Sequence, residues 1–386
     1  MTKTNIYFRA IGDDVFSEPF PVLRTSLGYS LNKSVAIKSA TASLIYTKEF
    51  KNFLLLLNEE KILLCDLYVD DKLYLQGFIN DRLIHYADGE NGTDINIRIL
   101  DRFVGLISSD TILSRPNGTL QSYLSNVLTE LGYDNPRIIN TYNRKIKTTK
   151  DFLKASGDIN LNEPLKALRR STLTEEDTSS VLGECLGINQ VMLISNGYDT
   201  LTFEKPNILG DSTFSAFRYL SGNKSSNIIS LEKYGEMGDA NSLMPSIIIT
   251  LNTYKKATKK DNNTSNIAIN KYGIPHVVRI NRVNSELSYQ DIDGMMNFAF
   301  AGIKARSNSF IIRLANSNFD KFGNFFQPNR TIRLYDEKYG LDFNMVIMEV
   351  KIDIDSEGGS ETTLNVSFTE SFIDNVSIKQ KGRILR

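Results

Sequence analysis

Alternation of apolar and polar residues predicts antiparallel β structure over the first hundred residues. Residues 62–69 and 72–79 are two apolar-rich segments separated by Asp70-Asp71, which is the spacing of a β-hairpin. Isoleucines alternate with polar residues over 95–99, so we expect one face of that segment to be buried and the other to be exposed to solvent. A glycine-containing turn at 88–92 precedes it. Consecutive hairpins of this kind indicate an antiparallel meander rather than a parallel βαβ sheet.

The apolar period changes to that of a helix after residue 119. Residues 120–131 carry apolar side chains on one helical face, with Thr119 as the N-cap candidate and Gly132 beyond the end. The polar stretch 140–171 shows little periodicity, and we expect a loop there with a short helix near Pro164. This part of the chain is therefore predicted to differ from the β region before it.

A second helix and a hairpin complete this middle part. The helix is predicted to begin near Thr174 and to bury an apolar stripe that includes Cys185 and Leu186. Asn196-Gly197 lies between two apolar segments and is a strong hairpin signal. Two helices and a hairpin predict a small α+β domain over 109–208.

Extended apolar segments return after residue 225. The predicted strands cover residues 227–234, 246–251, 277–280, 309–314, 331–335, 344–354 and 362–368. A helix is predicted from about 288 to 306, and the spacing of its Met and Phe residues favours a packing face over a ligand pocket.

The last predicted hairpin repeats features of an early one. Residues 88–103 align without gaps to residues 357–372, with shared Gly, Thr, Asn and Phe positions and the apolar alternation in phase. This echo predicts two β modules of one type. One would be residues 1–108, and the other would combine the strands after about 307 with those from 225 to 252. A trimer of such a chain could form a pseudo-sixfold ring.

Composition fits a folded chain of several domains. The sequence has 386 residues, 41% of them hydrophobic, and 45 Lys+Arg balance 45 Asp+Glu. A net charge of zero gives no general attraction to nucleic acid or to an anionic membrane. The apolar run Phe53–Leu57 is far shorter than the ~20 residues that span a bilayer. Without an apolar signal core after Met1, we expect folding in a reducing compartment and no membrane insertion.

Few residues are available for catalysis or metal binding. His85 and His276 are the only imidazoles, and neither has a metal-ligand spacing. Cys65 and Cys185 lie in apolar segments and are expected to be buried. The acidic pair Glu175-Glu176 falls in the first turn of a predicted helix, where acids favour the positive end of the helix dipole. The sequence lacks the common phosphate, dinucleotide and nucleophile-elbow motifs, so we predict no catalytic, cofactor or metal residues and no enzyme activity.

One polar loop is rich in lysine. Lys255, Lys256, Lys259 and Lys260 could together neutralise a few phosphates, which would give weak and salt-sensitive affinity. Only Tyr254 accompanies them, so no platform for stacking bases is present. We expect a solvated connection with negligible affinity for DNA.

The order and spacing of these segments carry a family resemblance over nearly the full length. The segments are residues 72–82, 95–102, 120–131, 186–197, 325–334, 346–350 and 363–369. In their order the chain resembles the baseplate hub proteins of contractile phage tails, most closely the hub of Mu-like phages. It is more distantly similar to the hub of T-even phages and to the N-terminal part of type six secretion spike proteins. The absence of Trp and the lysine-rich loop depart from that pattern.

The resemblance implies a trimeric ring of α+β, mainly β, subunits. Each chain would contain two similar antiparallel β-barrel-like tube domains and two smaller α+β domains. The implied boundaries are 1–108 for the first tube domain, 109–208 for the α+β domain, 209–262 with 307–377 for the second tube domain, 263–306 for an inserted small α/β domain, and 378–386 for a C-terminal tail.

The resemblance also implies a structural function. The homotrimer would be an adaptor that joins the hexameric tail tube, or a tube-initiator protein, to the trimeric central spike. Other baseplate proteins would contact it, and DNA would pass through its lumen without specific binding. Its place would be the tail baseplate of a virion, assembled in the cytoplasm of a bacterial host.

Two other functions stay open. A tail-associated cell-wall hydrolase would need a carboxylate pair or a Cys/His site, and the sequence offers no recognisable candidate. A carbohydrate-binding β-rich module would use surface tyrosines, and the 17 tyrosines are scattered along the chain. Peptidoglycan hydrolysis and glycan-array binding would distinguish these functions from that of a structural hub.

Overall fold

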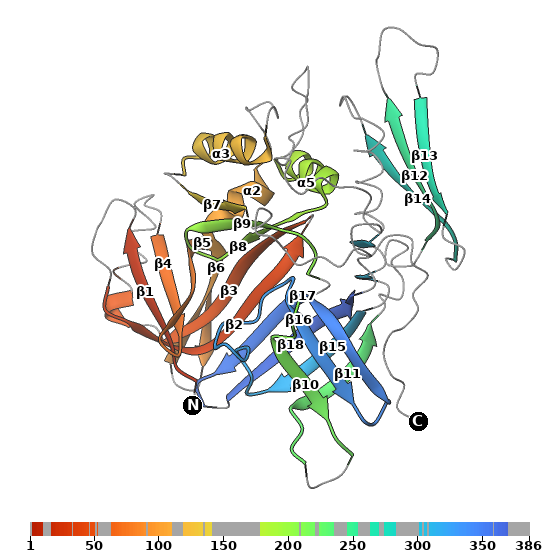
Figure 1. Cartoon of the computed structure of the whole chain (residues 1–386). Helices are drawn as coiled ribbons and strands as arrows, with labels where there is room; N and C mark the ends of the chain where they lie inside the picture. Colours follow the sequence, from red (N-terminus) through yellow and green to blue (C-terminus); the bar gives the residue numbers. More distant parts are fainter. Residues whose placement is uncertain are drawn as a thin grey trace.

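The computed structural model is mainly β, as the alternating segments predict (Figure 1). Red and orange strands form one barrel-like group, and green and blue strands form another beside it. The structure describes residues 2–10, 17–32, 34–45, 47–50, 52, 63–89, 92–109, 119–133, 136–140, 178–207, 210–220, 224–234, 245–253, 263–269, 274–282, 301–302, 305–306, 309–357 and 359–369.

Six strands close the first barrel. They are β1 (Thr4–Ala10), β2 (Phe20–Asn32), β3 (Val35–Ile45), β4 (Leu63–Val69), β5 (Lys72–Gly89) and β6 (Gly92–Asp101). Antiparallel ladders join them in the order β1-β4-β5-β6-β3-β2 and back to β1. The β4–β5 turn has positive φ at Asp70 (48°) and Asp71 (61°), the type I′ geometry that suits strand twist. The strands and hairpins predicted for this region are confirmed.

A second group also contains six strands. They are β10 (Phe214–Arg218), β11 (Ile228–Tyr234), β15 (Ser309–Ala315), β16 (Thr331–Asp336), β17 (Leu341–Asp355) and β18 (Gly359–Phe368). Ladders join them in the order β10-β16-β17-β18-β15-β11. Asn227, just before β11, links the two ends of this order. Its N–H donates to the carbonyl oxygen of Phe217 at 3.1 Å, and its side-chain Oδ1 accepts from the Phe217 N–H at 2.7 Å.

The two groups share one strand order. When the strands of each group are counted along the chain, ladders join first to fourth, fourth to fifth, fifth to sixth, sixth to third and third to second in both. The first strands differ, because β1 is antiparallel to β4 whereas β10 is parallel to β16. The hairpin of residues 88–103 belongs to the fifth and sixth strands of its group, and so does the aligned segment that begins at residue 357. The sequence echo therefore lies at equivalent places in the two groups.

The α+β part lies between the two groups in sequence. It contains η1 (Arg102–Val104), α2 (Gly105–Ser108), α3 (Leu120–Glu130), β7 (Arg137–Asn140), α5 (Thr178–Asn189), β8 (Met192–Ser195) and β9 (Thr200–Glu204). Both predicted helices and the hairpin are confirmed, and Thr119 caps α3 by accepting the Ser122 N–H at 3.2 Å. The short strand β7, which pairs with β9 in parallel, was not predicted. Residues 141–177, with Pro164 and Thr174, lie outside the described residues.

Two apolar clusters form the core. One is continuous through both barrels and includes Phe8, Leu27, Ile99, Ile352 and Val366. The other packs α3 and α5 against β8 and β9. Because β8 also pairs in parallel with the start of β3, the α+β part extends the sheet of the first barrel.

A separate three-stranded sheet contains β12 (Pro245–Thr253), β13 (Asn263–Ile269) and β14 (Ile274–Arg282). β12 covers the strand predicted at 246–251, but it pairs with β13 and β14 and with no described strand of the second group, where we expected it. The lysine-rich loop and most of the helix predicted at 288–306 lie outside the described residues. Among the helices that are described, none is long and apolar enough to cross a membrane.

Candidate functional site

One antiparallel sheet runs through both barrels. β2 touches β1 only at its start, and its residues Arg24–Ser30 then pair with residues Glu349–Asp355 of β17. We call this β2–β17 ladder the seam. Across the seam, eight strands follow one another in the order β11-β15-β18-β17-β2-β3-β6-β5, each antiparallel to its neighbours. One side of this sheet covers the core of the barrels. The other side is mainly exposed, except at the start of β3, where the α+β part packs against Val35 and Ile37.

On the exposed side of the six central strands, β6 to β15, most of the side chains are polar. Residues directly opposite one another on neighbouring strands share a face, so the register identifies its members. Its polar members are Asn96 and Arg98 of β6; Ser39, Thr41 and Ser43 of β3; Arg24, Ser26 and Ser30 of β2; Glu349, Lys351, Asp353 and Asp355 of β17; Glu361, Thr363 and Asn365 of β18; and Arg313 of β15. The register also places Gly28, Ile37, Leu100, Ile311 and Ala315 on this face. In this set, which we call the polar face, basic and acidic side chains are equal in number. Such a face has no net attraction for anions or cations.

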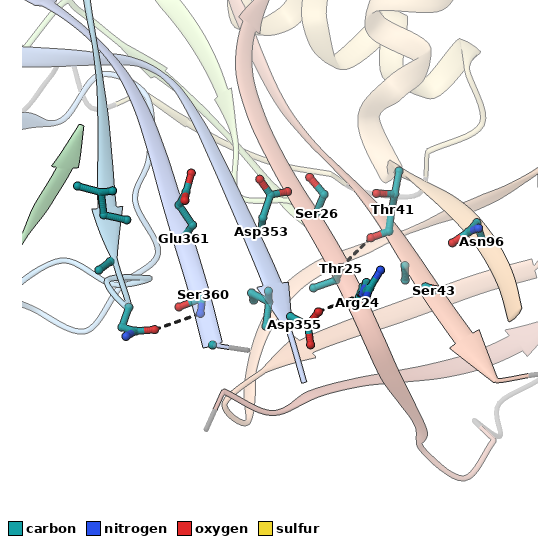
Figure 2. A pocket seen from close by; sticks show the side chains of 16 residues that line it. Arg24, Thr25, Ser26, Thr41, Ser43, Asn96, Asp353, Asp355, Ser360 and Glu361 are labelled. Atoms are coloured by element: carbon teal, nitrogen blue, oxygen red, sulfur yellow. Dashed lines mark hydrogen bonds and ion pairs between the residues drawn. The ribbon is translucent and has the colours of Figure 1, made fainter. Parts of the chain in front are cut away.

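The polar face is hollowed where the barrels meet (Figure 2). The hollow has a volume of about 750 Å³ and is lined from both barrels. Within it, Arg24 Nε lies 3.0 Å from Asp355 Oδ2. Asp353, which also lines the hollow, has its Oδ2 atom 2.8 Å from Nζ of the neighbouring Lys351. All four side chains are exposed, so each pair contributes little to stability. An open hollow with solvated charges suits contact with a large partner or with solvent rather than chemistry on a small substrate.

Lys38 of β3 is buried on the opposite side of the sheet. Its Nζ donates to the carbonyl oxygens of Tyr74 and Asn196, at 2.8 Å each, and lies 5.9 Å from the centroid of the Phe325 ring. These contacts join the first barrel, the β8–β9 hairpin and the second barrel. Burial lowers the pKa of Lys38 to about 8. Gly197 lies against this side chain at φ +90°, and an added Cβ would lie 2.6 Å from Lys38 Cδ.

Asp101 marks the end of β6 beneath Lys38. One carboxylate oxygen accepts the backbone N–H of Lys38 at 2.9 Å, and the other accepts that of Phe103 at 2.8 Å, which caps η1. Burial raises the pKa of Asp101, although these hydrogen bonds and one from the Ser195 hydroxyl act in the opposite direction. The carboxylate thus orders a strand end and the start of a helix.

An ion pair joins the α+β part to the second barrel. Arg330 Nη1 and Nη2 lie 2.6 and 2.9 Å from the two carboxylate oxygens of Glu204 at the end of β9. The Asn329 side chain donates to Glu204 Oε2 at 3.0 Å and to the carbonyl oxygen of Lys205 at 2.8 Å. Burial acts against the charge of Arg330, but the Glu204 carboxylate raises the pKa of Arg330 above its usual value. We call this group the clamp. Like Lys38, it holds parts of the chain together.

The fold does not bring together the described residues that the sequence offered for catalysis or metal binding. Cys65 and Cys185 are buried in separate clusters, as predicted, and burial raises the pKa of the Cys65 thiol. His85 lies in β5 and His276 in β14, which belong to different sheets, and Glu175-Glu176 lies outside the described residues. Within the part of the chain that is described, no three His, Cys, Asp or Glu residues are grouped so as to hold a metal ion.

Sequence reasoning missed the seam and the Lys38 contacts. A local signal for Lys38 exists, because it stands at an inward position of β3 between Ala36 and Ala40. A lysine at such a position indicates a buried cation with specific partners. The seam has no local signal, since it pairs β2 with a strand more than 300 residues away.

Comparison with known proteins finds solved structures with a similar fold, but no protein family that matches the sequence. No family model and no curated protein matches the chain. The tail protein from Neisseria meningitidis MC58 matches with a TM-score of 0.68 at 9% identity, over 96% of this chain and 98% of that one. The 43 kDa tail protein of Shewanella oneidensis prophage MuSo2 matches with a TM-score of 0.62 at 13% identity, over 95% and 99%.

A third match extends the comparison to secretion systems. An Escherichia coli component of the type VI secretion system, described as structurally similar to T4 bacteriophage tail proteins gp27 and gp5, matches with a TM-score of 0.51 at 9% identity. The match covers 98% of this chain and 80% of that one. The chain therefore has a fold found in phage tail proteins, which confirms the coarser part of the resemblance seen in the sequence.

Proposed function

We propose that this chain is the structural hub of a contractile phage tail or phage-like injection particle. It would act as a trimeric adaptor between the hexameric tail tube and the trimeric central spike. The repeated strand order is the observation that carries this proposal, since one chain holds two groups of the same order on one continuous sheet. Three chains supply six such groups to a hexameric tube while presenting threefold symmetry to a spike.

The polar face is the surface best suited to line the channel of that ring. Many of its residues are small and polar, and its basic and acidic side chains balance. A phosphate backbone is held by clustered Lys and Arg, so a balanced face would let DNA pass without gripping it. Exposed positions of the outer strands and of the α+β part are left for other baseplate proteins.

The strand pairing suggests domain boundaries for this hub. The tube-type domains would be residues 1–108 and, for the second, the segment from 209 to β11 together with 307–377. Since β12 pairs with β13 and β14, the inserted small domain would begin before Pro245 rather than at residue 263. The α+β domain would keep the boundaries 109–208. The protein would have no enzymatic role and would reside in the tail baseplate of a virion.

Native mass spectrometry tests the proposal directly. We expect the mass of three chains, either for the protein alone or after addition of tail tube or spike protein, and a ring with six lobes in electron micrographs. A protein that stays monomeric or forms a stable dimer in the presence of both partners would contradict the hub.

Glycan binding is a second candidate because of one group of aromatic rings. Tyr219 lies between Phe217 and Tyr335, with ring centroids 5.6 and 5.4 Å apart, and Lys224 Nζ lies 4.8 Å from the Tyr219 centroid. These rings are tilted by 45° and 47° to one another, so a sugar ring would stack on one aromatic face, with polar groups beside it. Glycan-array binding that disappears in Tyr219→Ala would favour this function, and an array without signal would remove it.

A further inference from the structure

The outer wall of the second barrel carries a row of three aromatic rings. Phe217 of β10 lies opposite Tyr335 of β16 in the register, and Tyr219, one residue beyond β10, contacts both of these rings. All three side chains are only half-buried. Large aromatic side chains are usually covered in the folded chain, so this row offers apolar surface on which a ligand can stack.

Polar side chains lie directly beside these rings. Arg333 is two residues before Tyr335 on the same face of β16, and the register places it between Ser215 of β10 and Asn344 of β17. Arg333 Nε and Nη2 donate to the two carboxylate oxygens of Asp342 at 2.8 and 2.9 Å, which fixes the guanidinium plane. A hydroxyl, a guanidinium, an amide and a carboxylate therefore adjoin an aromatic ring, and these groups can pair with the hydroxyls of a sugar.

One lysine lies over the aromatic row without an acidic partner. The Nζ atom of Lys224 is 4.8 Å from the centroid of the Tyr219 ring, and this lysine forms no ion pair in the part of the chain that is described. Its side chain is exposed, so an anion can reach the ammonium group from solvent.

The other charges of this wall cancel one another. Arg333 is paired with Asp342, as described above, and Arg218 is paired with the buried Asp336. Glu337 accepts the backbone N–H of residue 220 at 2.7 Å, and its charge is opposed by that of the next residue, a lysine. The positive charge of Lys224 therefore remains, and it is complementary to an acidic ligand.

The equivalent wall of the first barrel has rings in a different electrostatic setting. β1 and β4 are the first and fourth strands of their group, as β10 and β16 are of theirs. On the outer side of β1 and β4, the ring centroids of Tyr7 and Tyr68 lie 5.4 Å apart, and Tyr7 lies opposite Asp66 in the register. Burial and the charge of Asp66 both raise the pKa of Tyr68. An acidic group therefore accompanies the rings of the first wall, whereas a lysine accompanies those of the second.

We propose that the β10–β16 wall binds an acidic carbohydrate. One sugar ring would stack on Tyr335 with its hydroxyls paired to Arg333 and Asn344, and the carboxylate of an adjoining uronic acid would lie at Lys224. The proposal rests on the glycan-binding candidate given above, which it narrows to acidic polymers, and it does not depend on the hub.

Titration of the full chain with two hexasaccharides, followed by saturation-transfer NMR, tests this site. The acidic probe is hyaluronan hexasaccharide, in which uronic acid alternates with N-acetylglucosamine, and the neutral probe is chitohexaose. We expect the acidic probe to bind more tightly and to lose this advantage as the salt concentration rises. Tyr335→Ala should weaken binding of both probes about tenfold, because it removes the stacking surface. Lys224→Gln should weaken binding of the acidic probe by at most about fivefold and leave that of the neutral probe unchanged.

Two matched variants separate this site from general effects of charge and aromatic surface. Lys233→Gln removes an exposed lysine of β11 in the same barrel, and Tyr7→Ala removes a ring from the equivalent wall of the first barrel. Both should bind the two probes as the wild type does. Equal affinity of the wild type for the two probes, or unchanged binding of the acidic probe by Lys224→Gln, would overturn the acidic specificity alone. A wild type that binds neither probe would overturn the glycan-binding candidate as well, whereas the hub is tested separately by the mass of the assembly.

Discussion

The two barrels reach one strand order by different closures. In the first, β1 completes the ring through backbone ladders on both sides, to β2 and to β4. In the second, β10 lies parallel to β16, and the remaining gap is bridged by the side chain and backbone of Asn227. The order of the ladders from the second to the sixth strand is therefore the same in both barrels, and the barrels differ in how the first strand is joined to the others. The strands from second to sixth enclose the shared core in both barrels, whereas the hydrogen bonds of one residue, Asn227, take the place of a closing ladder in the second.

A core substitution at the seam should have the largest effect and would test whether the barrels are one cooperative unit. Ile352 of β17 faces Leu27 of β2 in the register, and both are buried in the core cluster common to the barrels. Ile352→Ala should cost about 2–5 kcal/mol of unfolding free energy, because it leaves a cavity. Hydrogen exchange should become faster in both barrels together, as measured in β4 and β18.

Leu128→Ala is the matched control for that substitution. Leu128 is equally buried but belongs to the cluster of the α+β part. Its loss should accelerate exchange in α3 and α5 more than in β18. If Ile352→Ala affected only the second barrel, the continuous core would consist of two independent units.

The next prediction concerns Lys38, which joins the barrels. Because burial lowers its pKa, Lys38 should make the folded chain more stable as the pH rises. The pKa of Lys38 is lowered from 10.5 to about 8 in the folded chain, so the unfolded chain binds more protons between those values. Its contribution to stability is fully present above pH 10.5 and is lost as the pH falls through 8. The whole change is about 3 kcal/mol.

Denaturant unfolding at a series of pH values measures this dependence. Lys38→Met should remove the rise of stability between pH 8 and 10. Lys351→Met removes an exposed lysine from the same sheet and should retain that rise. Equal pH profiles for the wild type and Lys38→Met would show that the buried ammonium does not titrate in this window.

Much of the fold is predictable from the sequence because its signals are local. Alternation fixed the strands around Asp70-Asp71, and helical spacing after Thr119 predicted α3. The sequence echo at residues 88–103 located equivalent hairpins of the two barrels. The ladder partners of β12 and of β2 were not predictable, since alternation gives the inward face of a strand but not its neighbour. The polar face is invisible for the same reason, because its residues come from six strands far apart in the chain.

The clamp should matter less than the core but more than a surface ion pair. Arg330→Met breaks the two-pronged pair with Glu204, which is largely buried, and should cost about 2 kcal/mol. Arg24→Met removes the exposed pair with Asp355 and should cost less than about 1 kcal/mol. Chemical denaturation compares the two variants. Equal costs would show that the clamp does not hold the α+β part to the second barrel.

The last prediction tests the different closures of the two barrels. The Asn227 side chain accepts the N–H of Phe217 at 2.7 Å and donates to the carbonyl oxygen of Ser215 at 2.9 Å. Asn227→Ala removes both side-chain hydrogen bonds and should cost about 1–2 kcal/mol, because only the backbone bond from the residue 227 N–H to the Phe217 carbonyl oxygen then links β10 to the start of β11. Asn227→Asp keeps the acceptor but loses the donor, so its cost should be intermediate. Exchange at the Phe217 amide should accelerate in Asn227→Ala but not in Asn227→Asp, and should stay unchanged in β1, whose closure uses backbone ladders. Unchanged exchange at Phe217 in Asn227→Ala would show that the parallel ladder with β16 alone holds β10 in place.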